Sequence, residues 1–357
     1  MYVLIRTDSS TEIGTGHTMR CLTLAESLQK MGASVGFICR DGPGNMNHLV
    51  EKRGFTVHRL PPIHFERKRL EWNDSDAEES LAILKKQPAI DWLIVDHYAL
   101  DWRWEQSMRA YANKIMVIDD LANRRHDCDL LLDQNLHREM QTRYQPWMVR
   151  DCRLLTGPRY ALLRPQFYVQ RQKLKKHDGL VRRIHICFGG SDPTNQTLKA
   201  LKAVTSLRAN QWEVDVVVGR ANPYKEEVKR ACSHIPGASF FSHVEEMAAL
   251  MAEADIAIGG GGSSIWERCC LGIPSLIISI ADNQTEVSQM CHDQQIIAYL
   301  GRQERVTSHQ IKLELKRLTE DRKALLALRT RALAAVDGLG ATRVCLALSG
   351  SNPPVLE

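Results

Sequence analysis

The sequence alternates short apolar runs with helical segments, and the alternation occurs twice along the chain. In the first half, the runs at 92–96 and 115–119 end in aspartate and lie between helical segments. Such runs are typical of buried parallel strands. The same pattern starts again at residue 184. We therefore predict an α/β protein of two doubly wound, Rossmann-like domains facing a cleft.

The expected elements follow from apolar spacing and from capping residues. Runs of continuous or alternating apolar residues predict strands at 2–6, 34–39, 57–60, 92–96, 115–119, 129–133, 153–156, 184–188, 212–218, 238–242, 256–259 and 274–279. An apolar spacing of three to four residues predicts helices at 18–31, 45–53, 76–87, 193–207, 224–234, 244–253, from 264, at 284–293 and over most of 307–336.

The length of 357 residues is too great for one compact core and suits two domains. We place an N-terminal domain at 1–165, a polar, basic and solvated linker at 166–183, and a C-terminal domain at 184–340. The remaining tail is 341–357, and one interpretation is a final helix that crosses back to the first domain. The segments 60–80 and 300–357 carry no motif that we can place.

Charge and cysteine usage exclude several classes of protein. The 47 basic and 42 acidic side chains give a net charge of +5, without the clustering typical of nucleic-acid binders. No apolar stretch approaches the roughly 18 residues of a membrane helix, and the N-terminus does not resemble a signal peptide. The ten cysteines form no Cys-x-x-Cys pair. We expect a cytoplasmic protein with reduced cysteines and no bound metal, and no nucleic-acid or membrane partner.

The first loop that carries chemistry runs from residue 9 to residue 20, between the first strand and the first helix. Gly14, Thr15 and Gly16 let a ligand approach the backbone, and a helix N-terminus favours phosphate. His17 follows them, and the helix dipole disfavours its protonated form. A neutral imidazole there can take a proton from water, or it can simply cap the helix or contact phosphate. From spacing alone these interpretations are equal. Arg20 lies one turn further along, and we predict that it contacts the substrate.

Two other glycine-rich loops follow strands. In the loop 188–195, Gly190 and Ser191 suggest close approach of a bulky group, although Asp192 before Pro193 also reads as a plain helix cap. The loop 258–267 contains four consecutive glycines, which carry a high entropic cost and are rarely kept for packing alone. We expect its candidate ligand contacts to be Gly261, Gly262, Ser263, Ser264 and Glu267.

Alternatives remain open for several of these residues. Glu267 fits either a capping box with Ser264 or a carboxylate that binds ribose hydroxyls, and spacing alone favours the box. Asn283 and Gln284 open a helix after a strand and fit either sugar binding or capping. Tyr98 follows the run 92–96 and is either a sugar contact or a rim residue.

The adjacent aspartates Asp119 and Asp120 end the run 115–119. They suggest either a metal site or solvated strand-end caps, and we favour caps because no further acidic or histidine cluster has metal spacing. Ligands of such sheets bind beyond the carboxyl ends of the strands, so we expect all of these loops to open toward the cleft.

These motifs resemble a known family. The segments IRTD at 5–8, IGTGHTMRCL at 13–22, VDHYALD at 95–101 and GGGGSSIWE at 259–267 are similar to the UDP-2,4-diacetamido-2,4,6-trideoxy-β-L-altropyranose hydrolases of pseudaminic acid biosynthesis. The pattern also resembles spore-coat polysaccharide proteins. The second half is similar to the nucleotide-binding domain of glycosyltransferase-B enzymes, notably the N-acetylglucosaminyltransferase of peptidoglycan synthesis.

The resemblance implies a division of roles. UDP would lie mainly on the C-terminal domain, with Glu267 on the ribose and residues 260–264 on the diphosphate. His17 would activate water, with Asn283 and Tyr98 near the sugar and no metal or other cofactor. The expected reaction is inverting hydrolysis of a UDP-sugar by a monomeric enzyme. The alternatives are a glycosyltransferase, in which His17 deprotonates an acceptor hydroxyl, and a non-catalytic nucleotide-sugar binding protein.

Overall fold

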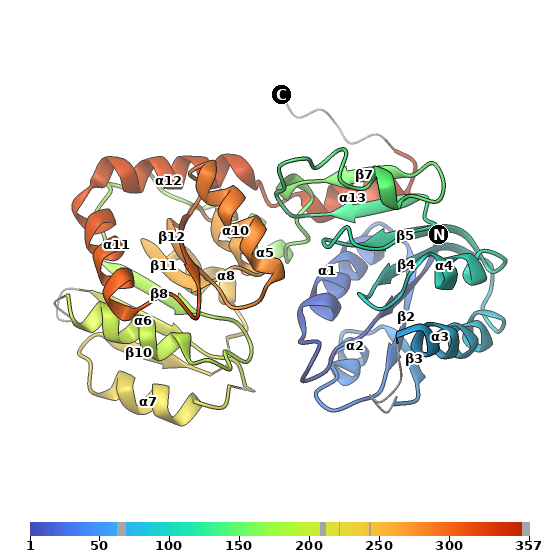
Figure 1. Ribbon diagram of the computed structural model, residues 1–357, viewed down its shortest axis with the longest axis horizontal. Helices are drawn as coiled ribbons and strands as arrows, with labels where there is room; N and C mark the ends of the chain where they lie inside the picture. The colour runs from blue at the N-terminus through green and yellow to red at the C-terminus, as the bar shows by residue number, and fades with distance from the viewer. Residues whose placement is uncertain (63–68, 208–211, 221, 243, 352–357) are drawn as a thin grey trace. The chain divides into compact units, whose positions relative to one another are not determined.

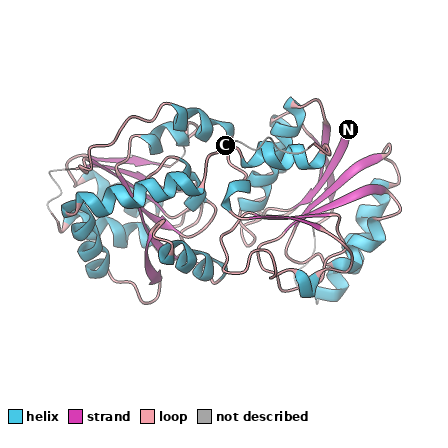
Figure 2. Cartoon of the chain, turned by 90° about the horizontal axis from the view of Figure 1, so that it is seen from above, coloured by secondary structure: helices cyan, strands magenta, loops and turns pink. Residues whose placement is uncertain are grey.

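The computed structural model describes residues 1–62, 69–207, 212–220, 222–242 and 244–351. The chain forms two compact units, one made of Met1–Leu162 with Leu339–Glu357 and the other of Leu163–Gly338 (Figure 1). Each unit is a parallel sheet flanked by helices, as the colouring of Figure 2 shows. The predicted class of two Rossmann-like α/β domains is confirmed.

The first unit contains a seven-stranded parallel sheet in the order β3-β2-β1-β4-β5-β6-β7. Its strands are β1 (Tyr2–Thr7), β2 (Ser34–Arg40), β3 (Thr56–Leu60), β4 (Ile90–Asp96), β5 (Ala112–Ile118), β6 (Leu130–Asp133) and β7 (Arg153–Thr156). Its helices are α1 (Gly16–Lys30), α2 (Asn47–Lys52), α3 (Arg69–Leu84), α4 (Trp102–Met108), α13 (Gly340–Leu348) and the short 3₁₀ helices Gln145–Trp147 and Pro158–Tyr160.

Apolar cores cover both faces of this sheet. Val3 and Ile5 of β1 join the core that includes α1 and α13, whereas Leu4 joins the core that includes Trp104 of α4. Successive strand residues point to opposite faces, so a strand buried on both sides reads as a continuous apolar run. This is why β1, β4 and β5 could be predicted from the sequence.

The second unit contains a six-stranded parallel sheet in the order β10-β9-β8-β11-β12-β13. Its strands are β8 (Arg183–Cys187), β9 (Glu213–Val217), β10 (Ala238–Phe241), β11 (Ile256–Gly260), β12 (Ser275–Ser279) and β13 (Ala298–Arg302). Its helices are α5 (Pro165–Gln172), α6 (Gln196–Thr205), α7 (Lys225–Ser233), α8 (Met247–Ala252), α9 (Ser264–Cys270), α10 (Asn283–Asp293), α11 (Ser308–Glu320) and α12 (Arg322–Ala335).

Helix α6 begins three residues later than expected. Asp192 and Asn195 both have positive φ, 40° and 52°, so Pro193 lies in a turn and not in the first helical turn. Asn195 is the N-cap, and its side chain accepts from the N–H of Leu198. Asp192 still stabilises the start of the helix, because its carboxylate accepts from the N–H groups of Gln196 and Thr197.

Other differences concern segments with weak patterns. The edge strand β13 was not expected, because it is short and contains Gly301. The range 307–336 is interrupted at Asp321, whose side chain caps α12. The range 166–183 is not a bare solvated linker, because its first part lies in α5 and Phe167 is fully buried. The interpretations of 60–80 and 341–357 concern in part the residues 63–68 and 352–357, which lie outside the described residues.

Candidate functional site

His17 lies in the first turn of α1, directly after the Gly14–Gly16 loop, and it contacts Asp96 at the carboxyl end of β4. The His17 Nδ1 atom is 2.6 Å from Asp96 Oδ1, and both side chains are almost fully buried. Parallel strands β1 and β4 are neighbours, so the loop after β1 and the last residue of β4 meet at one edge of the sheet. The result is a histidine–carboxylate pair.

The contacts around His17 decide which ring nitrogen carries the proton. Arg20 Nη2 is 3.1 Å from Nδ1, but Asp96 Oδ1 is closer. An unprotonated Nδ1 would place its lone pair against a carboxylate oxygen at 2.6 Å, which is repulsive. Nδ1–H therefore donates to Asp96, and Nε2 carries the lone pair. Within the described residues no hydrogen bond engages Nε2, so it is the nitrogen able to accept a proton from a ligand or from water.

Arg20 fixes the carboxylate that orients His17. It donates through Nε to Oδ2 and through Nη2 to Oδ1 of Asp96, both at 2.6 Å. Burial alone would raise the pKa of Asp96, but Arg20 and then His17 outweigh burial and lower this pKa well below its ordinary value. Asp96 is therefore ionised at neutral pH. Arg20, which we predicted as a substrate contact, is here engaged with protein carboxylates.

Tyr98 packs against the edge of the His17 ring. The two ring centroids are 4.5 Å apart with an interplanar angle of 85°. The Tyr98 hydroxyl donates to Asp120 Oδ1 at 2.8 Å, and Asp120 Oδ2 lies 3.7 Å from Arg20 Nη1. The side chains of His17, Arg20, Asp96, Tyr98 and Asp120 thus form one connected group at the carboxyl edge of the first sheet.

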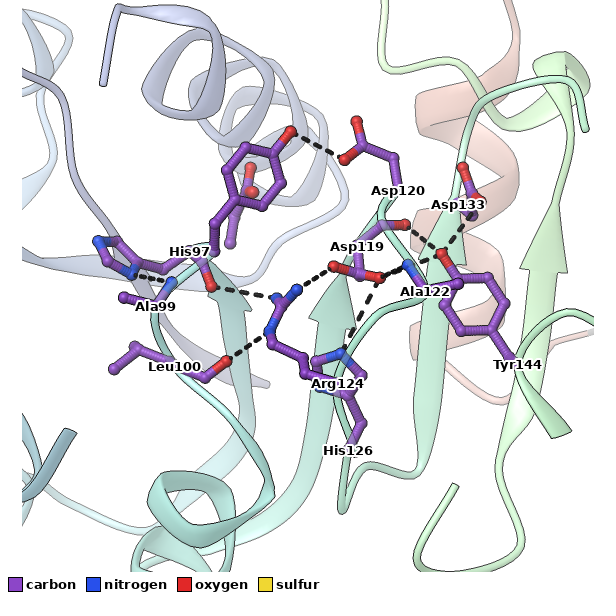
Figure 3. Close-up of polar contacts among 12 residues, drawn as sticks. His97, Ala99, Leu100, Asp119, Asp120, Ala122, Arg124, His126, Asp133 and Tyr144 are labelled. Atoms are coloured by element: carbon purple, nitrogen blue, oxygen red, sulfur yellow. Dashed lines mark hydrogen bonds and ion pairs between the residues drawn. The ribbon is translucent and has the colours of Figure 1, made fainter. Parts of the chain in front are cut away.

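The neighbouring strand ends carry a second polar cluster (Figure 3). Asp119 is fully buried and accepts from Arg124 at 2.5 Å. Tyr144 Oη lies 3.2 Å from Asp119 Oδ2 and 3.0 Å from Asp133 Oδ2. The expectation of solvated caps at Asp119 and Asp120 was wrong for Asp119, because a buried arginine partner replaces solvent. Among the described residues, no three His, Cys, Asp or Glu side chains are grouped to hold a metal.

In the second unit, only part of the glycine run 259–262, which begins at the end of β11 and continues after it, is required by packing. A Cβ on Gly259 would lie 2.3 Å from Cys187 O, and a Cβ on Gly261 would lie 2.5 Å from Ser288 Oγ. Gly260 and Gly262 would meet nothing closer than 3.5 Å. In the described part of the chain, no acceptor engages the N–H groups of Gly262 and Ser263. This segment therefore exposes free donors and has space beside them.

Gln284 ties this segment to the next loop. Its Oε1 accepts from the N–H of Gly261 at 3.1 Å and from the N–H of Ile280 at 3.0 Å. Its Nε2 lies 3.6 Å from the Cβ position of Gly262. The Oε1 atom of Gln284 thus holds the two loops together, whereas its Nε2 atom lies beside the glycine run. Asn283 is the exposed first residue of α10, after the N-cap Asp282.

Glu267 does not form the capping box that its spacing favours. The N-cap of α9 is Ser263, which makes no side-chain cap hydrogen bond. Ser264 Oγ instead accepts from Arg268, and Glu267 Oε1 accepts from Arg164 Nη2 at 3.2 Å. Glu267 is about one-fifth exposed, so its carboxylate is held in place and remains reachable.

The loop after β8 approaches the loop after β9 very closely. A Cβ on Gly219 would lie 1.9 Å from Gly190 O, so Gly219 must be glycine for the backbones to pass. A Cβ on Gly190 itself would meet nothing within 4 Å. Gly190 and Ser191 are exposed. A cavity of about 270 Å³ lies at the carboxyl ends of β12 and β13, lined by residues 279–282 and 302–304.

Sequence reasoning missed several residues of these clusters. Asp96 was noticed as a strand-end aspartate but was not assigned to His17, because 79 positions separate them. Arg164 and Arg268 belong to no motif in the sequence and were not singled out. The sequence contained one indication of the His17–Asp96 pair. Asp96 ends a predicted strand, and His17 begins the helix that follows another predicted strand.

The two sheets and the loops at their carboxyl edges define a protein of the glycosyltransferase-B fold. Over 98% of this chain and 99% of the other, it aligns with Acinetobacter baumannii MurG at a TM-score of 0.67 and 14% identity. It aligns with Neisseria meningitidis UDP-GlcNAc 2-epimerase, bound to UDP-GlcNAc, at a TM-score of 0.64 and 12% identity, over 98% and 100% of the two chains. Residues 185–339 match the glycosyltransferase family 28 C-terminal domain.

Three proteins are similar to this chain in sequence over most of its length. The chain is 27% identical to the UDP-2,4-diacetamido-2,4,6-trideoxy-β-L-altropyranose hydrolase of Campylobacter jejuni, over 80% of this chain and 93% of that protein. It is 25% identical to a spore coat polysaccharide biosynthesis protein of Bacillus subtilis, over 96% of each chain. It is also 25% identical to an uncharacterized protein of Methanocaldococcus jannaschii, but this match spans only 58% of that longer protein and 82% of this chain.

No helix in the described part of the chain is long and apolar enough to cross a membrane.

Proposed function

We propose that this protein hydrolyses UDP-2,4-diacetamido-2,4,6-trideoxy-β-L-altropyranose, releasing UDP and the free sugar used for pseudaminic acid biosynthesis. The observation that carries the proposal is the His17–Asp96 pair, which leaves Nε2 of a buried histidine as a base. The hydrolase of Campylobacter jejuni supports the choice of reaction and sugar. The glycine-rich segment after β11 supports a nucleotide diphosphate as the group bound.

The proposed step is a single displacement at the anomeric carbon. Water attacks this carbon while Nε2 of His17 takes its proton, and the bond from the carbon to the UDP oxygen breaks. Asp96 accepts the Nδ1–H bond throughout and stabilises the imidazolium that forms. The attack occurs on the face opposite UDP, so the anomeric configuration inverts.

The second unit supplies the groups that hold UDP in this proposal. Glu267 accepts hydrogen bonds from the ribose hydroxyls, and Arg164 keeps its carboxylate in place. The segment 260–264 and the loop at Gly190 and Ser191 receive the diphosphate. Main-chain N–H groups stabilise charge on the leaving UDP without a metal ion. Asn283, Gln284 and Tyr98 are the proposed contacts to the sugar.

The test is UDP release from the nucleotide sugar in buffer alone, in H₂¹⁸O. We expect one ¹⁸O atom in the free sugar and none in UDP. Label in UDP instead would mean attack at phosphorus and would contradict the proposal. A panel of UDP-sugars assayed in the same way identifies the preferred sugar.

His17→Ala should lose at least about two orders of magnitude in turnover, because general base assistance contributes about 10²–10⁴-fold. UDP binding, measured by calorimetry, should remain as in the wild type. A variant that keeps nearly full turnover would remove His17 from the mechanism.

The family 28 match over residues 185–339 favours a second candidate, a UDP-sugar glycosyltransferase. In that reaction Nε2 of His17 would deprotonate an acceptor hydroxyl. UDP release that requires an added acceptor, with no ¹⁸O in the sugar, would select this candidate over the hydrolase.

A further inference from the structure

Arg268 of α9 lies buried directly beneath the glycine-rich segment after β11. Its side chain is among the largest that are fully buried. Nη2 donates to Gly260 O at 2.6 Å, and Nη1 donates to Ser264 Oγ at 3.2 Å. A Cβ on Gly259 would lie 2.9 Å from Nη1, so glycine at this position makes room for the guanidinium. Both hydrogen bonds of Arg268 in the described part of the chain thus go to residues 260–264, the segment proposed to receive the diphosphate.

The guanidinium has no ionic partner among the described residues. Glu267 is the carboxylate whose charge acts on the pKa of Arg268, but it accepts its hydrogen bond from Arg164. Burial and then Arg268 itself lower the pKa of His185 to about 3, so that side chain is neutral. Burial raises the pKa of Cys187, so the thiol is neutral as well. The Nε atom of Arg268 has no acceptor in the described part of the chain.

A buried arginine with only neutral partners is costly for the folded protein. Burial lowers the pKa of Arg268, but a guanidinium starts so high that it keeps its proton at neutral pH. Desolvating a cation without an opposing charge destabilises the folded protein. The other buried arginines in the described part of the chain, such as Arg6 and Arg20, are paired with aspartates. The charge of Arg268 is balanced only if an anion binds nearby.

Ser264 is the link between Arg268 and the surface. Its Oγ accepts from Arg268, so its hydroxyl proton is left to donate elsewhere. Donation from a cation polarises the hydroxyl and makes it a better donor. Ser264 is partly exposed. The positive charge of Arg268 can therefore act on a ligand of this segment through the Ser264 hydroxyl.

We propose that Arg268 is a positioning residue that supplies the fixed positive charge for the nucleotide diphosphate, acting through Ser264 and the 259–262 backbone. The inference rests on the proposed function only in taking a nucleoside diphosphate as the ligand. It predicts that the contribution of Arg268 depends on the charge of the ligand.

The test compares Arg268→Met and Arg268→Lys with the wild type in calorimetric binding of UDP, UMP and uridine. Arg268→Met should weaken UDP roughly tenfold or more, weaken UMP less and leave uridine unchanged, because only the phosphates respond to the lost charge. Arg268→Lys should recover much of the UDP affinity. The melting temperature of Arg268→Met without ligand should be unchanged or higher, because a buried unpaired charge is removed.

Arg171→Met is the matched control. Arg171 also donates only to main-chain carbonyls, those of Cys270, Leu333 and Val336, at the other end of α9. Its loss should lower the melting temperature and leave the ratio of UDP to uridine affinity as in the wild type.

Unchanged UDP affinity in Arg268→Met, or an equal loss for UDP and uridine, would overturn the proposal. If Arg268→Met does not fold, Ser264→Ala replaces it, and it must show the same preferential loss of UDP over uridine. Wild-type protein that binds UDP but releases none from any UDP-sugar would contradict the proposed reaction alone. If the wild type hydrolyses the UDP-sugar but Arg268→Met weakens UDP and uridine binding equally, only the Arg268 proposal is contradicted.

Discussion

Asp96 receives three donors at the carboxyl end of β4. His17 and Arg20 bond to it directly, and the thiol of Cys21 lies 3.4 Å from Oδ2. Arg20 and then His17 favour the ionised carboxylate, which explains why the pKa of Asp96 falls despite complete burial. An ionised Asp96 holds the proton of His17 on Nδ1 and leaves Nε2 basic. The chemistry proposed for His17 therefore depends on this aspartate.

Asp96→Asn should lower turnover by roughly 10²–10⁴-fold while UDP affinity stays the same. An amide can present its NH₂ group to Nδ1, which moves the imidazole proton to Nε2 and removes the base. Steady-state kinetics with calorimetric UDP binding measures both effects. Cys21→Ser is the control, because it alters a neighbour of the same carboxylate without changing the tautomer. Wild-type turnover in Asp96→Asn would show that the pair does not act as a base.

Asp133 behaves in the opposite way to Asp96. Burial raises its pKa to about 7, although the N–H of Asn135 and the charge of Arg143 oppose this. In the unfolded chain an aspartate has a pKa of about 3.9. Between about pH 4 and pH 7 the folded protein therefore retains a proton that the unfolded chain releases. The free energy of unfolding falls as the pH rises through this window, and the contribution is lost above about pH 7.

Asp133→Asn should remove this pH dependence. Relative to the wild type, the variant should gain stability as the pH rises from about 4.5 to about 7.5, by up to roughly 1.4 kcal/mol per unit of pKa shift. Thermal or urea unfolding followed at both pH values measures the difference. Asp129→Asn, on the amino-terminal side of the same strand, is the control. A parallel pH dependence in wild type and Asp133→Asn would mean that Asp133 is ionised in the folded protein.

At the scale of elements, the loops between strands and helices of the second unit contain two kinds of glycine. Gly219 and Gly261 are required because another part of the chain occupies the space of a side chain. Gly190 and Gly262 have no such neighbour within 3.5 Å. In the proposed function, glycine at the second pair lets a ligand approach the backbone.

Gly190→Ala and Gly219→Ala should therefore have opposite effects, although the two residues touch. Gly190→Ala should leave the melting temperature unchanged and weaken UDP binding. Gly219→Ala forces a Cβ onto Gly190 O and should lower stability by roughly 1–3 kcal/mol. Thermal unfolding and UDP calorimetry on both variants test this. Unaltered UDP binding in Gly190→Ala would show that no ligand approaches this loop.

At the scale of the whole molecule, the first unit is discontinuous in sequence. Helix α13 contributes Val344, Cys345 and Leu348 to the same core as α1. Trp92 of β4 donates through Nε1 to Leu348 O at 2.9 Å. The second unit, Leu163–Gly338, is a single stretch of chain. The first unit therefore needs the C-terminal helix to complete its core, whereas the apolar core of the second unit is formed by residues of its own range.

A fragment of residues 163–338 should fold alone and unfold cooperatively, whereas a fragment of residues 1–162 should not. Circular dichroism during heating distinguishes the two outcomes.

In the full chain, Val344→Ala should destabilise the first unit by roughly 1–3 kcal/mol, because a fully buried side chain is truncated. A stable 1–162 fragment would show that α13 is dispensable.

The amino-acid sequence by itself determined the elements and the loops. Continuous apolar runs flanked by helical segments indicate buried parallel strands, and glycines after them mark the loops at the strand ends, so the fold class and the position of the His17 loop were predictable. Short or weakly patterned segments such as β13 and the start of α6 were not, because edge exposure and positive φ leave little trace in apolar spacing.

Only the tertiary structure decided which side chains meet. Asp96 and His17 are brought together because β4 lies beside β1 in the sheet. Glu267 pairs with Arg164 and not with the helix start, and Arg268 lies beneath the glycines without a carboxylate. Spacing along a chain describes neighbours within one turn or one strand. Protonation and charge depend on burial and on partners far away in sequence, and these exist only after the sheets have formed.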